Sequence, residues 1–150
     1  MKLLNFQLSS LSHATSVIGF DTEWDFHNVG NLRKIEYDVN AATFIMKWSF
    51  DFSHSPWGRP KLFPNVNQCS LDFLAPSFVL ILPKNTNTFA DEDACISGIS
   101  KVVPITQSQP KAWQYRVKEQ WGENEAFNLL FDFQSGRSIE VGAYSVELRI

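Results

Sequence analysis

Hydrophobic and polar residues alternate over most of residues 35–52. Ile35, Tyr37 and Val39 alternate with acidic residues, and the same rhythm returns at every second position from Phe44 to Phe52. A repeat of two residues is typical of a β-strand with one buried face, because successive side chains point to opposite sides of a sheet. The short break at residues 40–42 therefore predicts a β-hairpin.

The C-terminal stretch shows a second pair of alternating runs. Apolar residues occupy every second position from Phe127 to Phe133 and, after the segment Gln-Ser-Gly that ends at Gly136, continue to the C-terminus. Three residues that end in glycine fit a hairpin turn in which Gly136 has a positive φ. The apolar phase shifts by one residue near Gly142, and a strand cannot hold both phases on one face, so we expect a bulge or bend there.

Two further apolar runs lie between the hairpins, at residues 68–74 and 77–82. Ala75-Pro76 between them predicts a turn, and the unbroken run from Phe78 to Leu82 predicts a central strand covered on both faces. One helical turn or two near 91–97 is the only helix that the sequence suggests. Together these patterns predict a single all-β domain over residues 1–150, an antiparallel sandwich or barrel of about 8–10 strands with at most that one short helix.

Composition narrows the class of protein. Hydrophobic residues make up 44% of the chain and aromatic residues 14%, which is ample for a core, and the formal net charge is −3. The basic residues are scattered rather than gathered into a patch, so we expect no nucleic-acid partner. No apolar run approaches the length of a membrane span or a secretion signal, and Cys69 and Cys95 lack metal or redox spacing. A cytoplasmic protein with two reduced thiols is the resulting prediction, although one disulfide between them stays possible on the sequence alone.

The segment Asp-Thr-Glu-Trp-Asp-Phe-His over residues 21–27 places Asp21, Glu23, Asp25 and His27 at alternate positions. In a strand these four side chains span about 20 Å, far more than one metal ion can reach, so at most two neighbours could share an ion. The structural interpretation, which we favour, is that these residues form the solvated face of a half-buried strand. The other is an acid/base or metal pair.

The second candidate site is a constrained loop at residues 53–60, where Trp57 lies beside glycine and between prolines, with His54 and Arg59 nearby. Tryptophan and arginine are enriched at binding hot spots. Trp121, also followed by glycine, could join Trp57 in an aromatic platform. The competing interpretation is that both indoles fold back onto the core, since large apolar side chains are usually covered.

No family is recognised in the sequence. Lipocalin-type barrels carry a Gly-x-Trp near the start, whereas Trp24 here stands five residues after Gly19. The closing segment 127–150 resembles the terminal hairpins of many small bacterial proteins of unassigned role, toxin-neutralising immunity proteins among them, and this resemblance implies only a hairpin.

Two functional hypotheses follow. Signatures for metal binding, nucleophilic catalysis and phosphate binding are absent from the sequence, so no cofactor or metal is predicted, and we favour a non-catalytic domain that binds a protein partner or a glycan through loop aromatics. The alternative is a small β-barrel enzyme or ligand carrier with inward-facing acids. An exposed edge strand could also pair two subunits.

Overall fold

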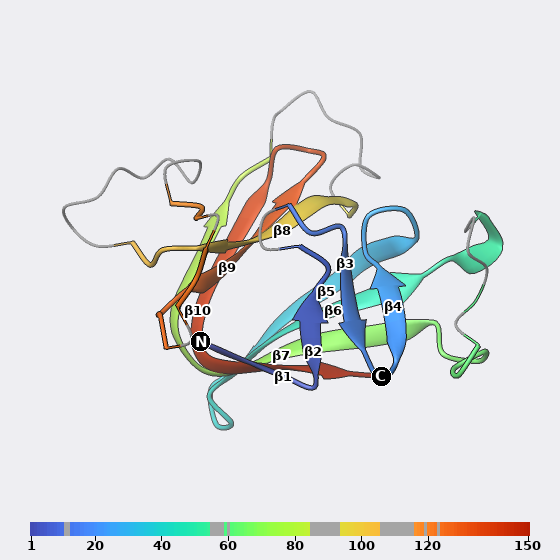
Figure 1. The fold of residues 1–150 in the computed structure, drawn as a ribbon, viewed down its shortest axis with the longest axis horizontal. Coiled ribbons are helices and arrows are strands. Elements are labelled where there is room, and N and C mark those ends of the chain that lie inside the picture. The colour runs from blue at the N-terminus through green and yellow to red at the C-terminus, as the bar shows by residue number, and fades with distance from the viewer. Residues whose placement is uncertain are drawn as a thin grey trace.

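The structure, a computed structural model, describes residues 1–10, 13–54, 59, 61–84, 94–105, 116–118, 120–122 and 124–150. These residues form an all-β fold with two sheets (Figure 1). The strands are β1 (Lys2–Leu4), β2 (Phe6–Leu8), β3 (Ser16–Gly19), β4 (Thr22–Asp25), β5 (Gly30–Asp38), β6 (Thr43–Phe50), β7 (Gln68–Leu82), β8 (Ile96–Val102), β9 (Asn128–Phe133) and β10 (Ser138–Arg149).

Helical structure is almost absent from the described residues, which contain one short 3-10 helix, η1 (Phe52–His54). The predicted helix near 91–97 lies partly outside the described residues, since 91–93 are not among them, and residues 96 and 97 begin β8 instead. Among all the described residues, no helix is long and apolar enough to cross a membrane.

The large sheet has the order β5-β6-β7-β10-β9-β8, with β1 added parallel to β10, and the small sheet has the order β2-β3-β4. Both predicted hairpins are confirmed: β5 pairs with β6, and β9 pairs with β10 around Gly136, whose φ is 80°. One backbone hydrogen bond, from Leu32 N to Ala94 O at 2.8 Å, links the outer strand β5 to the segment just before β8. No ladder joins β5 to β8 in the described part, so the sheets match the predicted sandwich and do not close into a barrel.

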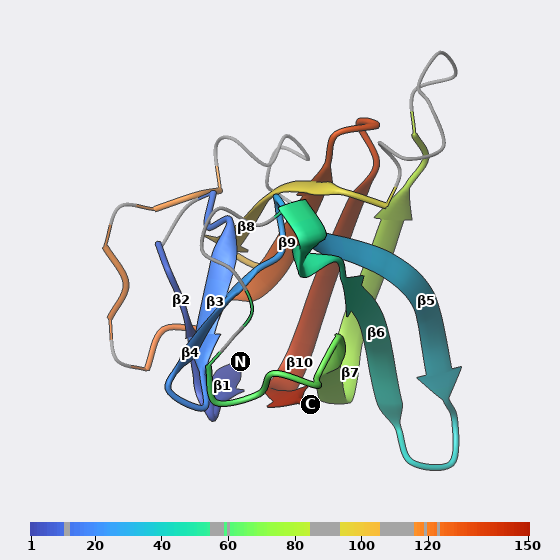
Figure 2. The same cartoon turned by 90° about the vertical axis from the view of Figure 1, so that its right-hand side faces the viewer.

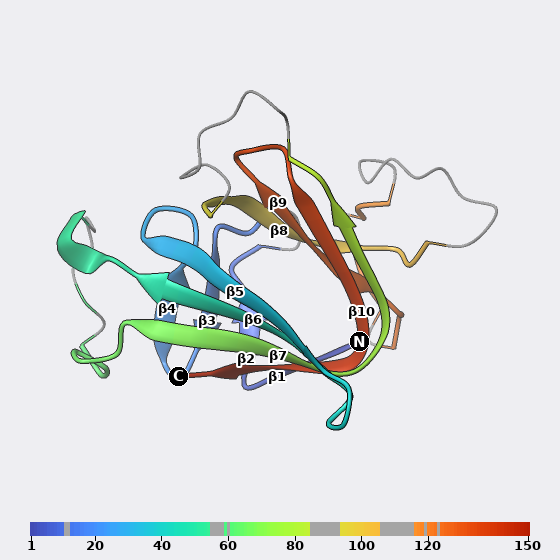
Figure 3. The same ribbon diagram turned by 180° about the vertical axis from the view of Figure 1, so that it is seen from behind.

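The large sheet bends sharply through its two longest strands, β7 and β10 (Figure 3). At the bend Ala75 has a φ of 47°, and the register of β10 against β7 shifts between Gly142 and Ala143. Such a bulge lets one strand pass from one layer to the next. The bulge predicted at Gly142 is therefore confirmed.

The predicted turn at Ala75-Pro76 is wrong. The chain bends there, but it continues as the single 15-residue strand β7. Residues 68–74 pair with β6 on one side and residues 70–74 also pair with β10 on the other, whereas residues beyond the bend continue only along β10. Ala75-Pro76 does bend the chain, but β7 pairs with β10 on both sides of the bend and therefore remains one strand.

Aromatic rings fill the space between the layers. Phe26 packs on Trp48 with ring centroids 4.8 Å apart, Trp24 packs on Phe50 at 5.5 Å, and Trp48 reaches Phe131 at 5.9 Å. The small sheet closes over this core and is tied to β8 by paired backbone hydrogen bonds between Ala14 and Ile99. Buried side chains from both sheets form one hydrophobic cluster.

Candidate binding surface

The second half of β7 has a described strand on one side only. The ladder between β6 and β7 runs from Gln68 to Leu74, while β10 accompanies β7 as far as Leu82. The last described backbone link on the β6 side is the hydrogen bond from Ala75 N to Ala42 O, at 2.9 Å. Beyond it, β6 turns back into its hairpin and parts from β7 (Figure 2). Among the described residues this half of β7 is therefore a free sheet edge, and such an edge presents unpaired N–H and C=O groups to another strand.

The side chains on this edge are apolar and partly exposed. The chain carries no charged residue from Phe73 to Pro83. Val79 is 38% exposed, and Ile81 and Leu82 are each 48% exposed. The prediction of a strand covered on both faces from Phe78 to Leu82 is therefore wrong. The sequence pattern indicated burial, whereas in the structure these side chains are partly exposed and β7 has no described strand on the β6 side beyond the bend.

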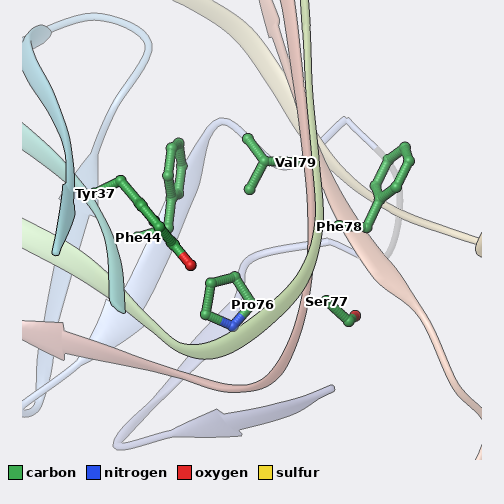
Figure 4. Close-up of a pocket in the computed structure, with 6 residues that line it drawn as sticks. All are labelled: Tyr37, Phe44, Pro76, Ser77, Phe78 and Val79. Atoms are coloured by element: carbon green, nitrogen blue, oxygen red, sulfur yellow. The ribbon is translucent and has the colours of Figure 1, made fainter. Parts of the chain in front are cut away.

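A groove of about 340 Å³ lies beside the edge, on the side of the β5–β6 hairpin (Figure 4). It is lined by Tyr37, Phe44, Pro76, Ser77, Phe78 and Val79. Phe44 is buried and forms part of the core, whereas the Tyr37 ring is 56% exposed and stands at the border of the groove. We call residues 76–82 of β7, together with Tyr37 and Phe44, the β7 edge surface.

The opposite face of the same strand carries a second hollow of about 330 Å³. It is lined by Ser77 and Phe78 of β7 together with Met1, Pro104, Ile105, Ala126, Phe127, Asn128 and Ala143. The edge therefore has an accessible hollow on each face, and the one beside the β5–β6 hairpin is the more apolar. An extended segment that pairs with β7 could place its alternate side chains into one hollow and then the other, as in strand-addition complexes.

Of the loop residues predicted from sequence, Arg59 and Trp121 are described, and neither lines the groove. Trp57 lies outside the described residues, and His54 ends η1 without a described side chain. Arg59 is exposed and donates a hydrogen bond from Nη1 to Pro64 O at 3.1 Å. The segments around 61–67 and 116–126 lie on opposite sides of the molecule in Figures 1 and 3.

Trp121 packs at the margin of the core. Its ring centroid is 5.7 Å from that of Phe127, and the Lys118 ammonium lies 5.3 Å from the indole centroid. The indole N–H is buried and has no hydrogen-bond partner among the described residues. These contacts fit a ring that covers the core, although its use in binding stays a prediction.

The acidic segment is the predicted strand, with β4 over Thr22–Asp25 and with Trp24 and Phe26 fully buried. Asp21 and Glu23 are exposed, and the Glu23 carboxylate accepts a hydrogen bond from the Ser16 hydroxyl. The enzyme or carrier hypothesis requires these acids to face inward. Their exposure removes that support at Asp21 and Glu23.

Asp25 and His27 have structural hydrogen bonds. The Asp25 carboxylate accepts hydrogen bonds from the backbone N–H groups of His27 and Asn28 at 3.0 and 2.8 Å, and from the Asn28 amide at 2.7 Å. It therefore closes the turn after β4. His27 Nδ1 lies 2.7 Å from Ile96 O, a carbonyl, so this nitrogen is the donor.

Cys95 contacts this turn, and its thiol is not activated as a nucleophile. Its Sγ donates a hydrogen bond to His27 O at 2.9 Å. Burial, and secondly the negative charge of Asp25, raise the pKa of the Cys95 thiol. A raised pKa keeps the sulfur protonated and makes it a poor nucleophile. Groups of three or more potential metal ligands are absent from the described residues.

The sequence patterns did not reveal a buried ion pair that contacts Asn128, one of the residues lining the second hollow. Arg116 Nη1 and Nη2 donate to the two Glu140 carboxylate oxygens at 2.8 and 2.5 Å, and Arg116 Nε donates to Val103 O at 2.7 Å. Asn128 Nδ2 completes the cluster with a 2.7 Å hydrogen bond to Glu140. In the sequence Glu140 belongs to the polar phase of a strand, and nothing there indicates that residue 116 covers it.

Comparison of the chain with protein-family models, with curated proteins and with solved structures finds no match.

Proposed function

We propose that this protein is a non-catalytic protein-interaction domain, and that it binds an extended polypeptide segment at the β7 edge surface. The observation that carries the proposal is the uncharged, partly exposed half of β7, which has a described strand on one side only and an apolar groove beside it. Strand addition supplies main-chain hydrogen bonds for affinity and side-chain hollows for specificity.

The chemistry of the groove favours a protein segment over a glycan. Among its lining side chains, the polar groups are the hydroxyls of Tyr37 and Ser77, and the remaining four are apolar. A sugar needs several converging hydrogen-bond groups, whereas an extended peptide brings its own backbone donors and acceptors to a free edge. The partner class is therefore a segment with apolar residues at alternate positions.

A cytoplasmic setting belongs to the same proposal. Cys69 and Cys95 are both free thiols in the structure, which suits a reducing compartment.

A random peptide library tests the proposed function although the natural partner is unidentified. The protein is immobilised at low density, so that copies cannot pair, and random extended peptides are selected on it. We expect selected peptides to alternate apolar residues, and to lose at least tenfold in affinity for the variants Val79→Lys and Ile81→Lys, because a bound strand would bury the new charge.

The matched control is Leu62→Lys, which places the same charge at a position that is 60% exposed and lies outside the surface. All three variants should keep the wild-type circular dichroism spectrum and nearly the wild-type melting temperature. Peptides that bind the edge variants as tightly as they bind wild type would refute this site.

A further inference from the structure

We propose that the strand added to β7 is the same segment of a second copy, so that the protein is a symmetric dimer with antiparallel β7 strands at its centre. This inference rests on the proposed function and names its partner. The two chains would pair over Phe78–Leu82, with Leu80 of one copy opposite Leu80 of the other.

The register follows from symmetry and from the bulge. Phe78–Leu82 is the part of the free half that pairs with β10 in continuous register, from Ser138↔Leu82 to Gly142↔Phe78. A twofold axis perpendicular to a sheet keeps each side chain on its own face, and directly opposed residues of an antiparallel pair share a face. The axis must therefore pass at a residue that faces itself, and Leu80 is the midpoint of this segment.

The edge is complementary to itself in side-chain pattern and in charge. In this register Phe78 faces Leu82, Val79 faces Ile81 and Leu80 faces Leu80, so every opposed pair is apolar. Lys84, the first charged residue after the strand, would face Pro76 rather than a second lysine. Like charges opposite each other destabilise a strand pair, and this pairing contains none.

Dimerisation also closes the exposed surface. Edge strands are usually protected by charges or by short length, and Phe78–Leu82 has no charged side chain. Val79 and Ile81 of the second copy would lie on the same face as those of the first, and would extend the floor of the groove beside Tyr37. Because the contact is isologous, each copy uses its free half of β7 once and the assembly stops at two.

Sedimentation equilibrium tests the dimer directly. From about 1 µM to 1 mM, a range that covers weak protein association, wild type should approach twice the chain mass of 17.1 kDa. Val79→Lys and Ile81→Lys should weaken dimerisation about a hundredfold, because each dimer would bury two uncompensated ammonium groups. Leu62→Lys should dimerise as wild type does.

Cross-linking tests the register and does not depend on the lysine variants. Leu80→Cys should cross-link to itself with a short bismaleimide, whereas Leu82→Cys should do so only when mixed with Phe78→Cys. Wild type with its two native thiols is the background control. Cross-links of Leu80→Cys at the wild-type level, or a dimer that is insensitive to the edge lysines, would overturn the inference.

The two proposals fail separately. A chain that stays monomeric through this range, yet binds selected peptides in a Val79-dependent way, refutes the dimer and keeps the interaction domain with a foreign partner. A monomer whose peptide binding ignores both edge lysines refutes both proposals.

Discussion

The buried Arg116–Glu140 pair provides the strongest stability prediction. Replacing Arg116 by Met removes two hydrogen bonds to Glu140 and one to Val103 O, at 2.8, 2.5 and 2.7 Å, and leaves a carboxylate that is 4% exposed without its cation. Asn128 would remain its only described hydrogen-bond donor. Breaking one partner of a buried pair typically costs about 3–5 kcal/mol, so we expect Arg116→Met to lose that much free energy of unfolding.

The magnitude is measured by urea denaturation at pH 7, monitored by tryptophan fluorescence and circular dichroism. Arg149→Met is the matched control, because Arg149 also pairs with carboxylates, Asp72 at 3.2 Å and Glu147 at 2.9 Å, but its side chain is 59% exposed. Exposed pairs contribute little, so this control should lose less than about 1 kcal/mol.

A double variant separates the ion pair from the packing of the arginine stem. In Arg116→Met with Glu140→Gln no uncompensated charge is buried, so the double variant should lose clearly less than the sum of its two single variants. If Arg116→Met costs no more than Arg149→Met, or if the two single losses simply add, the structural interpretation of this cluster is wrong.

Three other substitutions or treatments test separate parts of the fold. Gly142→Ala would place its Cβ 2.5 Å from Asn128 Oδ1 and should cost about 1–3 kcal/mol of unfolding free energy in the same denaturation assay. Gly122→Ala is the control and should be near neutral, because its Cβ would meet nothing closer than 3.9 Å. Burial raises the pKa of Asp132, so ionisation of this carboxyl opposes folding above its ordinary pKa of 3.8. The unfolding free energy of Asp132→Asn relative to wild type should therefore rise from pH 3 to pH 7. A difference in unfolding free energy that does not change with pH would contradict the raised pKa. Cys95 should react with iodoacetamide at pH 8 more slowly in the folded protein than in urea, as followed by mass spectrometry, because its raised pKa and partial burial keep it a protonated thiol.

The alternating pattern of the chain was enough to predict the class of fold and its local turns. Both hairpins and the bulge at Gly142 were predicted from the two-residue phase of the apolar positions. The positive φ at Gly136 was predicted from the residues of the turn. These are local properties, because a strand can bury only one phase of a two-residue repeat and a turn needs particular backbone angles.

The β7 edge surface could not be predicted from the alternation of apolar and polar residues. In the sequence, Phe78–Leu82 is a fully apolar run, and a central strand would have the same composition. Whether it is central depends on its neighbours in the sheet, and β6 begins at Thr43, opposite Leu74, so it does not accompany β7 beyond the bend at Ala75. The acids of residues 21–27 show the converse, since their pattern resembled a site while their hydrogen bonds are those of a strand and its turn.

By itself, then, the order of apolar and polar residues determined that the chain forms twisted sheets around an aromatic core. Only the tertiary structure decided which apolar residues lie outside that core and which polar residues, such as Arg116 and Glu140, lie inside the fold. The physical reason is that periodicity fixes the face on which a side chain lies, whereas burial depends on what covers that face, and the covering segments here come from distant parts of the chain.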